Sequence, residues 1–170
     1  MIIYKDIITD DEILSDSYDL KEVGGVVYEA DCAMINEGAV DVDIGANASA
    51  EEPDEGVEDQ VQKVNNIVYS FRLQPTSFDK KSYLAYLKGY MKAVKAKLQE
   101  KGAPEEEVKA FEAGAQKFVK ETILPNFKDY EFYIGESMNP DGMVILLNYR
   151  DDGVTPYVTI WKHGCTEMKV

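Results

Sequence analysis

The chain has 170 residues, of which 45% are hydrophobic, values typical of one globular domain (residues 1–170) with a buried core. Its formal net charge of −14 argues against general nucleic-acid binding, because phosphate contacts need a dominant basic surface. No segment is long and apolar enough to span a membrane, and the first residues lack the apolar core of a signal peptide. We therefore expect a cytoplasmic protein.

The N-terminal quarter is predicted to be rich in strands. Residues 1–4 are strand-like, and residues 18–23 and 26–32 form two more strand-like runs. Gly24-Gly25 lies between these two runs, which indicates a tight hairpin turn. Residues 6–17 are rich in acids and are expected to form a turn-rich connection.

An acidic segment follows at residues 37–66, with nine acids and one lysine. Such a composition buries too little apolar area to offset its ordering entropy, so we expect a mobile loop. Its carboxylates are hard oxygen ligands that attract calcium, but they lack the ordered spacing of a calcium-binding loop, so only weak binding is expected. Residues 66–73 alternate in the manner of a strand.

Residues 77–122 are the one long segment with helical periodicity, and they predict two antiparallel helices. Ser77 is expected to cap the first helix, Gly102 to end it, and Pro104 to begin the second. The apolar positions that follow the helical spacing are Leu84, Leu87, Met91, Val94 and Leu98 in the first helix and Val108, Phe111, Ala115, Phe118 and Thr122 in the second.

The first helix is strongly basic, since residues 80–101 contain seven lysines and one acid. The lysines that share one face are Lys81, Lys88, Lys92 and Lys95. On the other flank of the apolar seam lie Tyr83, Tyr86 and Tyr90. Two interpretations stay open: a solvated lysine face with a tyrosine edge packed on the sheet, or a basic docking ridge for an acidic partner.

The C-terminal quarter is again rich in strands. We expect strands at residues 130–134, 143–149, 155–161 and 166–170, with turns at 135–142 and 151–153. Glu136 lies at the first of these turns, where its carboxylate is expected either to bond the amides of the turn or to contact a partner. The order of elements predicts an α+β fold with a helical hairpin inserted between strands.

Motifs for enzymatic chemistry are absent from the sequence. There is no phosphate-binding glycine loop and no nucleophile elbow, and the single histidine, His163, is expected to be a solvated turn residue. Cys32 and Cys165 form no paired-cysteine motif, so a structural zinc site is not expected and the thiols should be reduced. Whether Cys165 forms an intermolecular disulfide stays open.

Two long motifs give the chain a recognisable resemblance. Residues 44–54 (IGANASAEEPD) and 127–149 (with FYIGE and NPDGM) resemble the two signatures of the translationally controlled tumour protein family. Residues 1–6 and 151–157 also match, so the resemblance extends over the full length. It implies a β-tent fold, similar to that of a small Rab-associated exchange factor, with a protruding helical hairpin and a mobile acidic loop.

The resemblance also implies partners and sites. The family is linked to protein synthesis and growth, to calcium, and to microtubules through the hairpin, which maps the tubulin contact to the lysine face of residues 80–101. A contact with translation elongation factors is implied as well. Exchange activity toward the small GTPase Rheb is the alternative, and it maps to Glu12, with Asp11 and Glu136 expected on the same patch. We expect a monomer that has no catalytic residues and is partly cytoskeletal.

Overall fold

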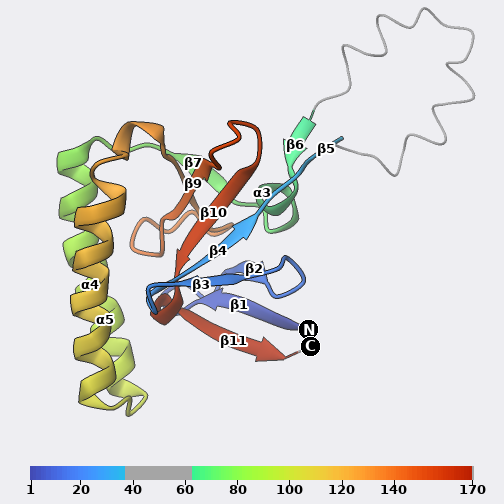
Figure 1. Cartoon of the computed structure of the whole chain (residues 1–170). Coiled ribbons are helices and arrows are strands. Elements are labelled where there is room, and N and C mark those ends of the chain that lie inside the picture. Colours follow the sequence, from blue (N-terminus) through green and yellow to red (C-terminus); the bar gives the residue numbers. More distant parts are fainter. Residues whose placement is uncertain (37–62, 170) are drawn as a thin grey trace, which may run out of the picture.

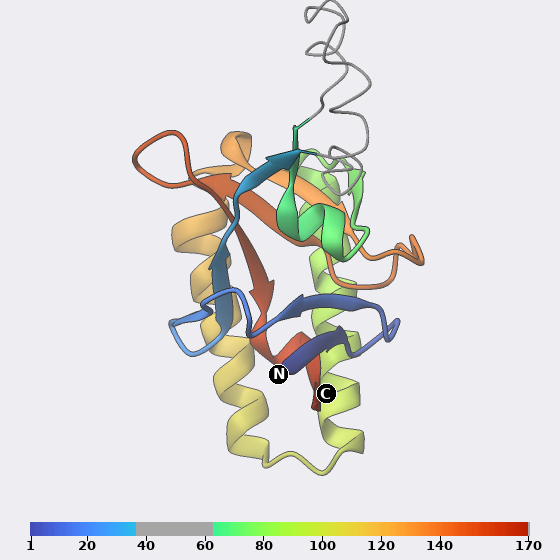
Figure 2. The same ribbon diagram turned by 90° about the vertical axis from the view of Figure 1, so that its right-hand side faces the viewer.

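The computed structural model describes residues 1–36 and 63–169, and it confirms the predicted α+β class. Three antiparallel sheets lie beside a helical hairpin, which stands along one side of the molecule (Figure 1). Figure 2 shows the two long helices running side by side behind the strands. The arrangement leaves one side of the hairpin against the sheets and the other side open.

The largest sheet has six strands in the order β3-β4-β10-β9-β8-β7. Their bounds are Lys21–Val23 (β3), Val27–Asp31 (β4), Pro156–Trp161 (β10), Ile145–Tyr149 (β9), Glu131–Ile134 (β8) and Gln74–Thr76 (β7). Gly24 and Gly25 have φ angles of 62° and 73°, and this turn joins β3 to β4 as predicted. Gly153 has a φ of 72° in the turn between β9 and β10, which confirms the second hairpin.

A three-stranded sheet pairs the two ends of the described chain. Its order is β11-β1-β2, with β1 at Ile2–Asp6, β2 at Glu12–Ser15 and β11 at Cys165–Lys169. The prediction of a turn-rich connection over residues 6–17 was therefore wrong for β2. Ile13 and Leu14 are 1% and 0% exposed there, so burial of these two side chains fixes a strand despite the surrounding acids.

Two further expectations fail between residues 63 and 73. Residues 63–66 were expected to belong to the mobile loop, but β6 (Lys63–Asn65) pairs with β5 (Met34–Asn36). Residues 66–73 were expected to form a strand, but α3 occupies Asn66–Ser70. The Asn65 side chain accepts hydrogen bonds from the amides of Ile67 and Val68, which starts the helix. The remainder of the predicted acidic loop, residues 37–62, lies outside the described residues.

The hairpin consists of α4 (Lys80–Glu100) and α5 (Glu105–Phe118), and a π-helical turn at Val119–Ile123 extends α5. Asp79, rather than Ser77, caps α4, because its carboxylate accepts a hydrogen bond from the Ser82 amide at 2.7 Å and Ser82 Oγ accepts one from the Asp79 amide at 3.0 Å. Gly102 has a φ of 80°, as the predicted end of the first helix requires. Two short 3₁₀ helices lie at Phe127–Asp129 and Lys162–Gly164.

The side of α4 that faces the sheet differs from the predicted seam. Tyr83 and Tyr90 are 0% and 2% exposed, whereas Leu84 is 40% exposed. Tyr83 packs with aromatic rings brought from other elements, namely Phe78, Phe127 and Phe132. Tyr83 and Tyr90 therefore belong to the core, as the interpretation with a tyrosine edge packed on the sheet predicted. The buried face of α4 is rotated toward these tyrosines relative to the predicted apolar seam. In α5 the predicted positions are buried, except that Ile123 replaces Thr122.

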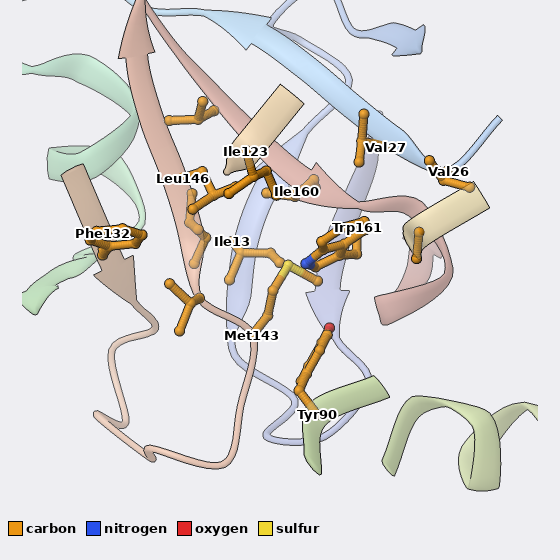
Figure 3. Close-up of a cluster of buried hydrophobic side chains, with 14 of the residues drawn as sticks. Ile13, Val26, Val27, Tyr90, Ile123, Phe132, Met143, Leu146, Ile160 and Trp161 are labelled. Carbon is orange, nitrogen blue, oxygen red and sulfur yellow. The ribbon is translucent and has the colours of Figure 1, made fainter. Parts of the chain in front are cut away.

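The core joins the large sheet to the hairpin. Trp161, Met143, Leu146 and Ile160 are each no more than 2% exposed, and the side chain of Tyr90 reaches from α4 toward Met143 (Figure 3). Burying each large apolar side chain contributes about 1.5–3 kcal/mol relative to exposure, so this cluster holds the hairpin against the strands.

Candidate functional site

The loop between β8 and β9, residues 135–142, is anchored to the core at its C-terminal end. Asp6 is 2% exposed and its carboxylate accepts the amides of Met143 at 2.7 Å and Ile8 at 2.8 Å. The hydroxyl of Tyr86 donates to the carbonyl of Gly142 at 2.6 Å and accepts the amide of Val144. Burial raises the pKa of the Asp6 carboxyl, and the donated amide bonds oppose that rise.

At its N-terminal end the same loop is held by Asp11. The Asp11 carboxylate accepts the Ser137 hydroxyl at 2.6 Å and the Ser137 amide at 3.3 Å. A Cβ at Gly135 would overlap this carboxylate, so only glycine allows the approach. Asp11 thus joins the β1–β2 loop to the β8–β9 loop, although 126 residues separate it from Ser137.

Glu136 lies beside this junction and is exposed. Its carboxylate pairs with the guanidinium of Arg72 at 3.1 Å, and the two side chains are 57% and 75% exposed. Of the two roles expected for Glu136, bonding the amides of its own turn is therefore not the contact seen among the described residues. Arg72 was missed by the sequence analysis, because 64 residues separate the pair and no spacing links them.

Glu12 follows Asp11 at the start of β2 and is exposed, opposite Lys5 on β1. The three acids predicted to share a patch therefore come from two loops that contact each other through Asp11 and Ser137. We use the name loop patch for the set Asp11, Glu12, Arg72 and Glu136, in which Asp11 is half-buried and the other three side chains are exposed. Glu12 is connected to the others through its neighbour Asp11.

Backbone geometry marks the same place. Within residues 1–36 and 63–169, the non-glycine residues with positive φ are Asp10 (69°), Arg72 (55°) and Met138 (59°). They lie in three separate loops, each of which contributes to the loop patch or adjoins it. Such angles cost free energy in non-glycine residues and concentrate at functional sites. Met138 is also 57% exposed, so this loop presents an apolar side chain to solvent.

The lysine face of α4 is a second candidate site. Lys81, Lys88 and Lys92 are exposed, and Lys95 pairs with Glu112 of α5 at 3.4 Å. These four lysines lie on α4, whereas the residues of the loop patch come from the β1–β2 loop and β2, the β8–β9 loop and Arg72. The two sets of predicted site residues therefore come from different elements.

His163 is not the solvated turn residue that the sequence predicted. Its side chain is 12% exposed, its ring lies 4.9 Å from that of Phe111, and its Nε2 is 3.5 Å from the Glu107 carboxylate. Burial lowers the pKa of His163, although the Glu107 charge opposes the change. Packing of α5 over the end of β10 explains the difference, since that contact is invisible in the local sequence.

The thiols and carboxylates of the described residues form no evident metal centre. Cys32 and Cys165 are unpaired, and Cys165 Sγ donates to the Trp161 carbonyl at 3.3 Å. Burial raises the pKa of both thiols. No cluster of three or more His, Cys, Asp or Glu suited to a metal occurs in the described ranges. In the same ranges, no helix has the length and apolar character needed to cross a membrane.

Antiparallel sheets, an external basic hairpin and an exposed loop patch together define a β-rich α+β protein whose distinctive surfaces are charged rather than enclosed. The sequence model of the translationally controlled tumour protein family matches residues 1–166. The chain belongs to this family.

Curated relatives and solved structures agree with that assignment. The chain is 73% identical to a translationally-controlled tumor protein homolog of Gibberella zeae and 62% identical to that of Saccharomyces cerevisiae, with all of each chain covered. It superimposes on the translationally controlled tumor-associated protein of Schizosaccharomyces pombe with a TM-score of 0.81 at 60% identity, covering both chains fully. For the Caenorhabditis elegans protein the TM-score is 0.71 at 33% identity, covering 100% and 99%.

Proposed function

We propose that this protein is a non-enzymatic cytoplasmic interaction protein that binds and stabilises microtubules through the lysine face of α4, and that it takes part in protein synthesis and growth through contacts with translation elongation factors. The observation that supports microtubule binding is electrostatic: residues 77–122 carry a net charge of +3, while the rest of the chain carries −17. An exposed basic ridge on an acidic body is attracted to acidic protein surfaces and oriented by them.

Co-sedimentation with polymerised tubulin tests the proposal. Reversing Lys88, Lys92 and Lys95 to glutamate should abolish most pelleting, and wild-type pelleting should fall as salt rises, because the Debye length shortens from about 10 Å at 0.1 M salt. The matched control reverses three exposed lysines off the hairpin, Lys21, Lys128 and Lys169, with the same change in net charge. Equal pelleting of the two triple variants would remove the lysine face as the binding site.

The second candidate function is guanine-nucleotide exchange, or protection of the empty form, for a small GTPase that contacts the loop patch. It is supported by the Asp11–Ser137 bond, which fixes the Glu12 and Glu136 loops against each other. An exchange factor acts by stabilising the GTPase between nucleotides, which requires a preformed surface of this kind.

Release of labelled nucleotide from the GTPase tests the second candidate. Glu12→Ala and Glu136→Ala should each slow the stimulated release, while changing the free energy of unfolding by no more than about 0.5 kcal/mol, as for other exposed sites. Glu100→Ala, at the end of α4, is the matched control. If release is not accelerated at high protein concentration, this candidate fails.

Weak calcium binding by residues 37–66 stays a prediction.

A further inference from the structure

A groove of about 470 Å³ lies between α4 and α5 on the outer side of the hairpin, and the π-helical turn forms part of its wall. Its lining residues all come from α4, α5, the π-helical turn and Leu124, none from a strand, and Figure 1 shows this hairpin along one side of the molecule. The floor of the groove is apolar and includes Leu84, Leu87, Met91, Ala115 and Val119. The volume is within the range of about 300–1,000 Å³ that is usual for binding pockets.

The floor is not closed by other parts of the described chain. Leu84 is 40% exposed and Met91 is partly exposed, whereas Leu87, Ala115 and Val119 beneath them are buried. Apolar side chains that are open to solvent and rimmed by charge can serve as anchors for a partner protein. The π-helical turn at Val119 is a feature that frequently occurs at functional sites.

The rim of the groove is basic. It carries Lys88, Lys92 and Lys95 from α4 and Lys120 from the π-helical turn. Among the described residues, the one acid that lines the groove is Glu112, and its carboxylate is already paired with Lys95. Lys88, Lys92 and Lys120 have no carboxylate within ion-pair distance in the described ranges. The rim therefore favours an occupant that brings its own carboxylates.

We propose that this groove binds an acidic amphipathic helix of a partner protein, with aliphatic side chains on the floor and carboxylates against the lysine rim. The inference rests on the lysine face of the proposed function and adds an apolar anchor to it. Leu84 and Lys95 are eleven residues apart on α4, which spans about 16 Å, or three helical turns. A partner helix of matching length presents anchors at positions i, i+4 and i+7.

A second copy of this chain fits the groove less well. A symmetric dimer through this face would place the two lysine rims against each other, and like charges at an interface oppose association. The acidic helix instead neutralises the rim while it covers Leu84 and Met91. Because of this difference in charge, we expect the groove to bind an acidic helix of another protein and not a second copy of this chain.

Fluorescence anisotropy with a labelled, designed 14-residue helix tests the proposal. The peptide carries leucine at the three anchor positions and glutamate at the flanking positions, and a scrambled peptide of the same composition is its control. The patterned peptide should bind saturably and at least tenfold more tightly than the scrambled one. Leu84→Ser/Met91→Ser and Lys88→Glu/Lys92→Glu should each weaken binding at least tenfold.

Lys97→Gln is the matched control variant, because Lys97 is on α4 but lines a different surface, and it should change the affinity by less than twofold. Circular dichroism of each variant separates loss of binding from loss of fold. Equal binding of the two peptides, or an unchanged affinity of the Leu84→Ser/Met91→Ser variant, would overturn the groove as an anchor. Dimerisation of the free protein that is lost in this variant would show instead that a second copy occupies the groove.

Microtubule pelleting measured on the same proteins distinguishes the two proposals. Pelleting without pattern-dependent peptide binding would support the microtubule function and overturn the groove. Peptide binding that requires Leu84 and Met91, without pelleting, would support the groove and contradict microtubule binding.

Discussion

At the scale of single residues, the histidine illustrates how packing sets the properties of a side chain. The folded protein binds the proton of His163 more weakly than the unfolded chain, because burial lowers its pKa from the ordinary 6.5. The neutral ring therefore contributes stability that is present above about pH 6.5 and is lost as the pH falls through the lower, folded pKa. Glu107 limits this loss, since its carboxylate favours the protonated ring.

Proton NMR can follow this group directly, because His163 is the single histidine of the chain. We expect its ring resonance to titrate with a midpoint below 6.5 in the folded protein. Glu107→Gln should lower the midpoint further by removing the attractive charge. Glu105→Gln, at an exposed position that pairs with Lys109 instead, should leave it unchanged. A folded-state midpoint at or above 6.5 would contradict the buried environment.

At the scale of elements, two glycines inside the helices of the hairpin have opposite surroundings. A Cβ at Gly89 of α4 would meet nothing within 4 Å, whereas one at Gly114 of α5 would lie 2.5 Å from Val26 Cγ1. Val26 is 4% exposed at the turn between β3 and β4, so it has little room to move. Gly114 is therefore the point of close approach that lets α5 dock on the sheet.

Alanine at each glycine should have opposite effects on stability. Gly89→Ala should raise the free energy of unfolding by about 0.5–1 kcal/mol, the usual gain in an unobstructed helix interior. Gly114→Ala should lower it by about 1–3 kcal/mol, because overpacking outweighs the gain in helix propensity. Urea unfolding of both variants measures the difference. Stabilisation of equal size in the two would show that Val26 gives way and that Gly114 sets no limit.

Elements with strong local signals were predictable from the sequence. The hairpins at Gly24-Gly25 and at Gly153 were found because glycine can adopt the positive φ that such turns need. The helical hairpin was found from its period and its glycine stop. These signals act within a few residues, so they are read without knowing the rest of the fold.

Elements decided by distant contacts were not predictable in the same way. The alternating pattern at residues 66–73 suggested a strand, and only the Asn65 cap, which the sequence analysis overlooked, pointed to α3. The helical period of α4 allowed either of two neighbouring faces to be buried. The face with Tyr83 is buried because its ring packs with Phe127 and Phe132, which are far along the chain. In the loop patch, Glu12 and Glu136 were linked only through the family resemblance, because no spacing encodes the Asp11–Ser137 bond.

At the scale of the whole molecule, charge and topology are both divided between parts. The basic hairpin and the acidic remainder give the molecule an electrical polarity, so that its two candidate surfaces attract partners of different charge. The sheets show a comparable division. The six-stranded sheet packs on the hairpin, while the three-stranded sheet joins β1 to β11 from opposite ends of the chain, and Figure 2 shows the two ends close together.

The pairing of β1 with β11 predicts that the last strand is needed for stability. β11 pairs with β1 in register from Ile2–Lys169 to Asp6–Cys165, and β1 is the middle strand of its sheet. A chain that ends at Gly164 loses five cross-strand pairs, and at about 0.2–1 kcal/mol for each pair the expected loss is about 1–5 kcal/mol. It also leaves β1 as an open edge, which promotes association.

A chain that ends at Met168 loses only the pair with Lys169 and should be nearly as stable as the full chain. Urea unfolding and size-exclusion chromatography of the two shortened chains measure both effects, and equal stability of the two would show that β11 contributes nothing to holding β1.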